Sequence, residues 1–178
     1  MAGRNLPFWV AVWLGISSVV CTIDALFIIL RPHTLPGGKW NYLFAPYNLY
    51  IQADPGYKDL KDAFVVGQSL MNLVEVCLNV ITVIMHIGGK AQLTSLLLAF
   101  MVNTMTFSKT VLYFLISSGL CGGHNYVSLS DWKKLIFLYI IPNGVWIVLP
   151  FLCMVATGRK MLQCMENDET TAKKLKSR

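Results

Sequence analysis

The sequence predicts an all-α fold, a multipass membrane protein built as a bundle of four transmembrane helices. Four apolar stretches are each long enough to cross about 30 Å of hydrocarbon, which takes roughly 20 helical residues. Of the 178 residues, 55% are hydrophobic and only 13% are charged, more apolar than is usual for a soluble domain. Each stretch also carries one polar stripe at helical spacing, as expected for helices that face one another inside a bilayer.

The first span is expected to run from Phe8 to Leu30. Arg4 precedes it, but the stretch is too long for a signal-peptide core and lacks a small-x-small cleavage site, so we interpret it as a retained helix. Pro32 ends it, because proline cannot continue a helix. The other spans are expected at Ala63–Ile87, Gln92–Ser118 and Lys134–Thr157, followed by a charged tail that is helical at first.

The segment from Arg31 to Lys61 is a long loop rich in proline, glycine and aromatic residues. Loops of this length in a compact domain are usually functional or disordered, and the aromatic content argues against disorder. Trp and Tyr favour the membrane–water interface. We therefore expect an ordered cap there, carrying Trp40, Tyr42, Phe44, Tyr47, Tyr50 and Tyr57. Gly88 to Lys90 predict a tight turn, and a second loop is expected from Gly119 to Lys133.

The formal net charge is +6. Because the basic residues lie mostly at helix ends and in the C-terminal tail, we interpret them as setting the orientation of the helices in the membrane rather than as a nucleic-acid binding surface. With four spans both termini share one side, and that side collects more basic residues, which favours the cytosol. Its members are Arg4, Lys90, Arg159, Lys160, Lys173, Lys174, Lys176 and Arg178. Lys174 and Lys176, fifth and third from the end, resemble a dilysine retrieval signal of the endoplasmic reticulum, a receptor-read address. A merely basic tail is the alternative.

Three ionisable residues lie inside the spans: Asp24, Glu75 and Lys109. Each costs about 2.5–3.5 kcal/mol to insert, so an intramembrane charge is by default a functional-site hypothesis. They belong to stripes at helical spacing, which we expect to turn inward. The stripes are Trp13, Ser17, Cys21 and Asp24; Gln68, Asn72, Glu75 and Asn79; Asn103, Thr106, Lys109, Thr110, Tyr113 and Ser117; and Tyr139, Asn143, Trp146 and Pro150.

These residue types predict proton transfer or cation binding rather than cofactor chemistry. The five cysteines show no disulfide framework, and Cys121 with His124 makes a weak metal signal, so neither metal nor cofactor is expected. A carboxyl group in an apolar cavity can act as a general acid, and a Trp face can stabilise a cation. This pairing suits protonation of an alkene or epoxide through a carbocation, or the binding of an amphipathic amine. Lys109 is expected to pair with Glu75 or Asp24 as a counter-ion.

Several short motifs resemble the emopamil-binding-protein family, the EXPERA domain, which includes sterol Δ8-Δ7 isomerase and the sigma-2 receptor. The resemblance covers roughly residues 9 to 157, within an expected domain at residues 1–160, with the tail at 161–178. The motifs are Cys21-Thr-Ile-Asp24-Ala-Leu-Phe, Tyr50-Ile-Gln-Ala-Asp54-Pro-Gly-Tyr57, Asn72-Leu-Val-Glu75, Thr110-Val-Leu-Tyr113-Phe-Leu and Asn143-Gly-Val-Trp146-Ile-Val-Leu-Pro150.

The resemblance implies an enzyme of the endoplasmic-reticulum membrane, an isomerase or cyclase that acts on a sterol or other isoprenoid lipid. Asp24 and Glu75 would be the catalytic acids. Trp146 would stack against a cation, and Asn143 would orient a polar group. The full substrate-binding set would be Asn72, Lys109, Thr110, Tyr113, Asn143, Trp146, Tyr50, Asp54 and Tyr57.

Two positions depart from the family pattern. Val20 stands where the sterol isomerase has a histidine, and Lys109 replaces a small residue. Both departures favour a different substrate or a protein that binds sterols or cationic amphiphiles without catalysis, in lipid trafficking or sensing. A scaffold whose stripes only hold helices together is a third interpretation. The expected partners are the bilayer and a lipid, without nucleic acid; the oligomeric state stays open, a homodimer included.

Overall fold

The computed structural model describes residues 5–89, 91–118, 120–121 and 131–176, and within these ranges it contains helices and no strand. Four helical segments in this part of the chain are long and apolar enough to cross a membrane. They are α1 (Phe8–Ile29), α3 (Ala63–Ile87), α4 (Gln92–Ser117) and the run that ends in α6 (Ile141–Lys176). The all-α, four-helix membrane fold expected from the sequence is confirmed.

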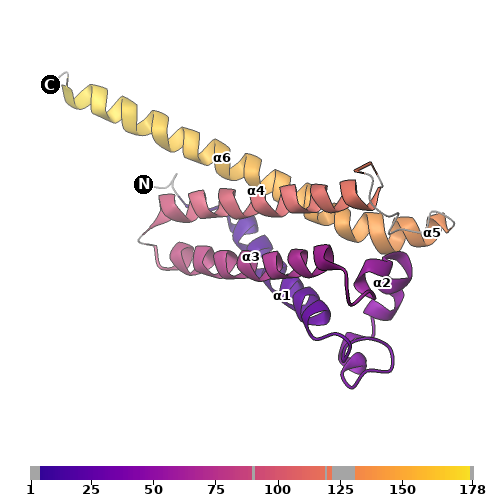
Figure 1. The fold of residues 1–178 in the computed structure, drawn as a ribbon. Coiled ribbons are helices and arrows are strands. Elements are labelled where there is room, and N and C mark those ends of the chain that lie inside the picture. The colour runs from indigo at the N-terminus through magenta and orange to yellow at the C-terminus, as the bar shows by residue number, and fades with distance from the viewer. Residues whose placement is uncertain (1–4, 90, 119, 122–130, 177–178) are drawn as a thin grey trace.

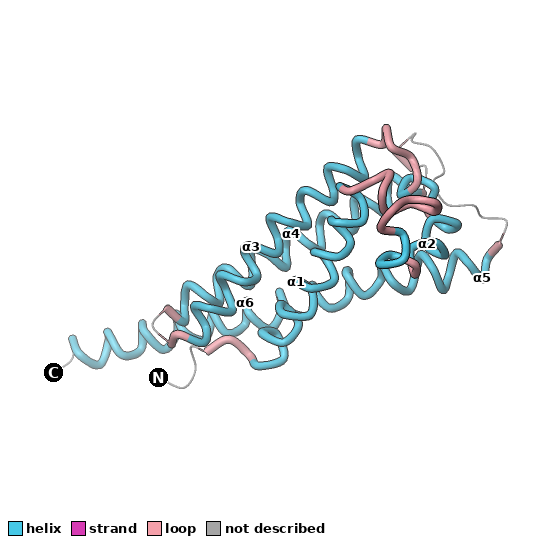
Figure 2. The backbone as a smooth tube through the Cα atoms, turned by 90° about the horizontal axis from the view of Figure 1, so that it is seen from below, coloured by secondary structure: helices cyan, strands magenta, loops and turns pink. Residues whose placement is uncertain are grey.

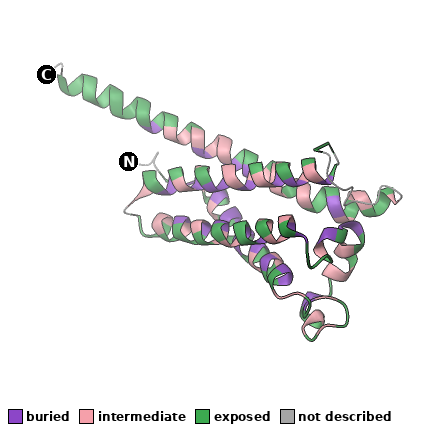
Figure 3. Ribbon diagram, viewed as in Figure 1, coloured by how far each residue is buried: buried purple, intermediate pink, exposed green. Residues whose placement is uncertain are grey.

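The helix boundaries lie close to those expected, except at the C-terminal end. Three spans agree with the sequence prediction to within one residue because apolar length and helix breakers define them. The last segment begins earlier, with α5 (Trp132–Lys134) and a π-helical turn η3 (Leu135–Ile140), and α6 continues without a break to Lys176. The charged tail therefore extends α6 out of the bundle as an exposed helix (Figures 1 and 3).

The helices pack in the order α1, α3, α4 and α6 (Figure 2). The indole rings of Trp13 and Trp146 meet edge to face, with centroids 5.5 Å apart, and so bring α1 against α6. Gly89 adopts a φ of +69° in the turn between α3 and α4, a conformation that glycine reaches without the steric penalty of a Cβ. Lys160 Nζ donates to the carbonyl of Asn5 at 2.6 Å, which places the start of the chain beside α6.

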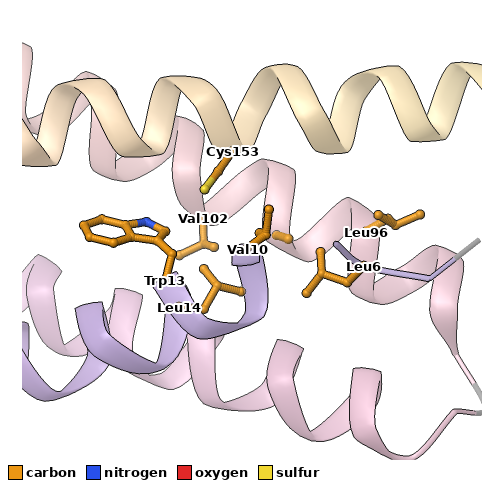
Figure 4. Packing of buried hydrophobic residues seen from close by; sticks show 8 residues of the cluster. Leu6, Val10, Trp13, Leu14, Leu96, Val102 and Cys153 are labelled. Carbon is orange, nitrogen blue, oxygen red and sulfur yellow. The ribbon is translucent and has the colours of Figure 1, made fainter. Parts of the chain in front are cut away.

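The predicted polar stripes face the interior, while large apolar side chains such as Ile84 and Val148 are exposed toward the expected lipid. At one end of the bundle the interior is a packed cluster from α1, α4 and α6 (Figure 4). Its buried members are Leu6, Val10, Trp13, Leu14, Leu96, Ala99, Val102 and Cys153. We call this cluster the packed half. The other half of the interior lies under the loop between α1 and α3.

That loop is an ordered cap, as expected. It folds into η1 (Asn41–Phe44), α2 (Tyr47–Ala53) and η2 (Pro55–Tyr57). The Arg31 guanidinium ties it to the end of α1 by donating to the carbonyls of Gly56, Tyr57 and Asp59 at 3.3, 3.1 and 2.7 Å. Phe27 stacks on Tyr47 with ring centroids 4.2 Å apart. These contacts place the phenol rings of the cap over the bundle.

The sequence predictions for Arg4, Lys90, His124 and Arg178, and most of the second loop, fall outside the described residues. Within the described part, no group of His, Cys, Asp and Glu side chains could hold a metal ion.

Candidate functional site

A cavity of about 470 Å³ lies between the bundle and the cap. Its volume is within the range of roughly 300–1,000 Å³ typical of small-molecule pockets. The lining is largely apolar and aromatic, and it draws on α1, α2, η2, α3, α4, η3 and α6. The cavity is lined by Val20, Cys21, Asp24, Pro46, Tyr47, Leu49, Tyr50, Tyr57, Gln68, Asn72, Lys109, Thr110, Tyr113, Leu138, Pro142, Asn143 and Trp146. We call this region the hollow half.

Asp24 is the carboxyl group that lines the cavity, and three different side chains donate hydrogen bonds to it. Tyr47 donates to Oδ1 at 3.2 Å, and Tyr57 bridges both oxygens at 3.1 and 3.3 Å. Asn72 Nδ2 donates to Oδ2 at 2.9 Å. Charge-assisted hydrogen bonds of this kind stabilise the ionised form of a carboxyl group. The cap and α3 therefore fix the orientation of the Asp24 carboxyl group on the cavity wall.

The two phenols beside Asp24 remain protonated donors. Burial, and next the neighbouring Asp24 carboxylate, raise the pKa of both Tyr47 and Tyr57 well above the ordinary value. A phenolate next to a carboxylate would place two like charges in a poorly solvated site. The hydrogen bonds from Tyr47 and Tyr57 to Asp24 are consequently kept at all physiological pH values.

Glu75 lies behind the cavity rather than on its wall. Its side chain is fully buried, and Oε2 forms an ion pair with Lys109 Nζ at 3.0 Å. Lys109 also donates to Asn72 Oδ1. A continuous chain of polar contacts therefore runs from Asp24 through Asn72 and Lys109 to Glu75. Of the two counter-ions considered for Lys109, the structure places it on Glu75, and Lys109 itself lines the cavity.

Asn143 and Trp146 lie on α6, shortly after the π-helical turn η3. Asn143 Nδ2 donates to the Tyr139 carbonyl at 2.8 Å and to Tyr50 Oη at 3.1 Å, which fastens α2 to α6. Trp146 follows one turn later and lines the cavity. Single π-helical turns are frequent at functional sites, and this one directly precedes the part of α6 whose Asn143 and Trp146 line the cavity.

The remaining expected binding residues divide into two groups. Thr110, Tyr113, Tyr50 and Tyr57 line the cavity. Asp54 does not: its Oδ1 accepts from the Gly56 amide at 3.0 Å and so caps η2, while Oδ2 is buried without a hydrogen-bond partner among the described residues. Burial raises the pKa of Asp54 to about 7. Its contribution is to hold the turn that presents Tyr57.

Sequence reasoning missed Tyr47, which both donates to Asp24 and lines the cavity. It also missed Gln68, Pro142 and Cys21 as cavity-lining residues. Gln68 and Cys21 belonged to the predicted stripes and could have been included on that signal. Tyr47 carried no such signal, because the path of the cap over the bundle depends on contacts between distant segments.

Comparison with family models gives no match, and searches of curated proteins and of solved structures give none either.

Proposed function

We propose that the hollow half binds a sterol or another isoprenoid lipid and carries out an isomerisation or cyclisation by proton transfer through a carbocation. The observation that supports this most directly is a lipid-sized cavity with a largely apolar and aromatic lining and one carboxyl group, Asp24, on its wall. Asp24 exchanges the proton, and the faces of the surrounding aromatic rings stabilise the positive charge that develops. The resemblance to the emopamil-binding-protein family supports the same proposal.

Within this proposal the two acids have different roles. Asp24 lines the cavity and is the catalytic acid and base. Glu75 is paired with Lys109 outside the wall, so its role is to fix the Lys109 ammonium and to balance its charge. Trp146 is oriented by its edge-to-face contact with Trp13, and stacks on the cation.

The test is deuterium uptake by candidate lipids. Membranes that contain the protein are incubated in deuterated water with Δ8-sterols and with linear isoprenoid epoxides, and the products are analysed by mass spectrometry. We expect product that carries deuterium with the wild type and loss of at least about 100-fold with Asp24→Asn, since removal of a proton-transfer group costs that order. Asp59→Asn is the matched control, because Asp59 is an exposed carboxyl of the cap. Absence of product and of deuterium across the panel would exclude catalysis.

A non-catalytic binder of cationic amphiphiles is the second candidate, and the hydrogen bonds to Asp24 favour it. Three side-chain donors converge on this carboxyl group, and its ionised form attracts a protonated amine as well as a transient carbocation. This candidate predicts saturable binding of a long-chain tertiary amine that Asp24→Asn abolishes, with no deuterium uptake by any lipid. Amine binding that survives Asp24→Asn would exclude it.

We further propose that the protein resides in the endoplasmic reticulum with both termini in the cytosol. Lys174 and Lys176 support this, because they lie on the exposed helical extension of α6, where a cytosolic receptor could bind them. Replacing both lysines by serine should release the protein to later compartments of the secretory pathway. The measurement is labelling of the protein at the cell surface with a membrane-impermeant amine reagent. Unchanged retention would contradict the retrieval signal.

A further inference from the structure

The cavity wall carries a cation that the proposed chemistry does not use. The Lys109 side chain is 11% exposed, and it lines the cavity while its ammonium is anchored from behind by Glu75 and Asn72. An ammonium group has three N–H donors. Two of them meet Glu75 Oε2 and Asn72 Oδ1, and the third has no acceptor among the described residues.

Most of the other polar groups of the wall already form hydrogen bonds within the protein, whereas the hydroxyl of the lining residue Tyr113 is buried without a partner among the described residues. Tyr47 and Tyr57 donate to Asp24, and Asn143 donates to Tyr50 and to a backbone carbonyl. Thr110 Oγ1 donates to the Thr106 carbonyl at 2.8 Å. A ligand oxygen that enters this cavity therefore finds its strongest available donor at Lys109, because hydrogen bonds from a charged donor are stronger than those between neutral groups.

We infer that Lys109 is a ligand-binding residue, and that the pocket selects an isoprenoid lipid bearing a neutral acceptor oxygen, a ketone or an epoxide. This inference rests on the proposed function and deepens it by naming the substrate class. The Asn72 carboxamide connects Lys109 to Asp24, because it accepts a hydrogen bond from Lys109 and donates one to Asp24. The pocket thus has two poles, an anion that meets a cationic or reacting centre and a cation that meets the oxygen.

The charge balance favours a neutral oxygen over a carboxylate. The site holds two carboxyl groups, those of Asp24 and Glu75, against one ammonium group, that of Lys109. A carboxylate ligand would bring a third carboxyl group and a further negative charge into surroundings where charges are poorly screened. A ketone or epoxide oxygen accepts the Lys109 hydrogen bond without changing the net charge.

The experiment compares probes that differ by one oxygen. The full chain in lipid nanodiscs is labelled with a diazirine-bearing sterol, and 5α-cholestan-3-one, 5α-cholestane, 2,3-epoxysqualene and squalene compete for labelling. We expect each oxygenated probe to compete about 10- to 100-fold better than its hydrocarbon, as one hydrogen bond to a charged group predicts. Cholanic acid, which carries a carboxylate, should compete less well than the ketone; the reverse order would overturn the assignment to a neutral oxygen.

Variants locate the preference on Lys109. The double variant Lys109→Met with Glu75→Gln removes both charges and leaves no unpaired ion, and it should reduce the preference to below about threefold while hydrocarbon competition is unchanged. Glu75→Asp keeps a carboxylate behind the ammonium and must keep the preference, which covers the case in which the double variant does not fold. Lys133→Met, an exposed lysine outside the cavity, is the matched control. A preference retained in the double variant, or lost in Glu75→Asp, overturns the inference.

The same experiment separates this inference from the proposed function. If both members of each pair compete equally with the wild type, the inference on Lys109 fails and the lipid pocket stands. If the diazirine sterol does not label the wild type and no probe competes, the proposed function fails, and the inference fails with it.

Discussion

The two halves of the bundle interior have the same four helices as walls but opposite contents. The packed half is filled by apolar side chains, with Val10, Leu96, Ala99 and Cys153 fully buried. The hollow half encloses about 470 Å³ of space, and its largely apolar and aromatic lining also carries polar groups such as Asp24 and Lys109. Trp13 marks the boundary, since its indole Nε1 donates to Asn103 at 3.2 Å while its ring contacts Trp146.

This difference separates stability from function. In a membrane, helix association depends on close packing because lipid is as apolar as the side chains themselves. The packed half provides that packing. The hollow half contains a cavity in place of packed side chains, and it holds charged groups that helix association alone does not require. A binding site in this half is therefore expected to lower the stability of the bundle. Substitutions in the two halves should therefore change different measurements.

The largest effect is expected from breaking the buried ion pair between Glu75 and Lys109 behind the cavity wall. Glu75→Leu leaves Lys109 without its counter-ion, and loss of one partner of a buried pair costs about 3–5 kcal/mol of unfolding free energy. The measurement is reversible unfolding of the purified chain in mixed micelles. Addition of Lys109→Met should restore most of the stability. A loss below about 1 kcal/mol, the range of exposed pairs, would show that the pair is solvated.

The next largest effect concerns the packed half alone. Leu14 is 1% exposed, and Leu14→Ala should cost about 2 kcal/mol, the low end for such truncations because the unfolded helix stays in lipid. Ligand affinity of the folded protein should stay unchanged. Val20→Ala is the matched control in the hollow half, because Val20 lines the cavity and is 38% exposed. It should alter affinity with little loss of stability; the opposite pattern would contradict the division into two halves.

A smaller effect should come from the phenol that bridges Asp24. Tyr57→Phe removes the hydrogen bonds to both carboxyl oxygens but keeps the ring. Amine or lipid affinity should change by about tenfold, the value of one hydrogen bond to a charged group. Tyr42→Phe is the control, since Tyr42 is an exposed phenol of the same cap. Equal effects of both substitutions would show that Asp24 does not depend on the cap.

The smallest effect is a pH dependence at Asp54. Its pKa is raised from 3.8 to about 7 by burial, with the Asp62 and Asp24 carboxylates acting in the same direction. Folding therefore favours the protonated form, and this stabilisation is fully present below about pH 4 and lost as the pH rises through 7. Between pH 6 and 7 the melting temperature should fall by about 2–4 °C, which corresponds to about 1 kcal/mol. Asp54→Asn keeps the cap of η2 and should abolish this fall; a fall that persists would assign it to another group.

The features that could be predicted from the sequence are the helices and their inward-facing polar stripes. The helices were predictable because apolar length and polar periodicity are local properties, as α3 illustrates with both of its ends at the expected residues, Ala63 and Ile87. The inward stripes placed Asp24, Asn72 and Lys109 together. The extension of α6 to Lys176 was underestimated, because a charged helix outside the membrane has no apolar signal.

The partners within the site were not predictable from spacing. Asp24 receives hydrogen bonds from Tyr47 and Tyr57, which are 23 and 33 residues away in a loop whose path no periodicity describes. Glu75 was correctly placed on the inward face of α3. However, Asn72 lies on the cavity wall, whereas Glu75, about one turn later, lies behind it. Helical spacing does not distinguish these two positions, because the position of Glu75 depends on how the Lys109 side chain packs.

The central claim, that a lipid occupies the hollow half beside Asp24, is tested most directly by mapping where a photoreactive sterol labels the chain. A diazirine sterol is cross-linked to the protein in membranes, and the modified residues are identified by mass spectrometry. The account predicts labels on cavity-lining segments of α1, α2 and α6, around Val20, Tyr47 and Trp146, that excess unlabelled sterol displaces. Labels confined to outward-facing residues such as Ile84 and Val148, and unaffected by competitor, would contradict it.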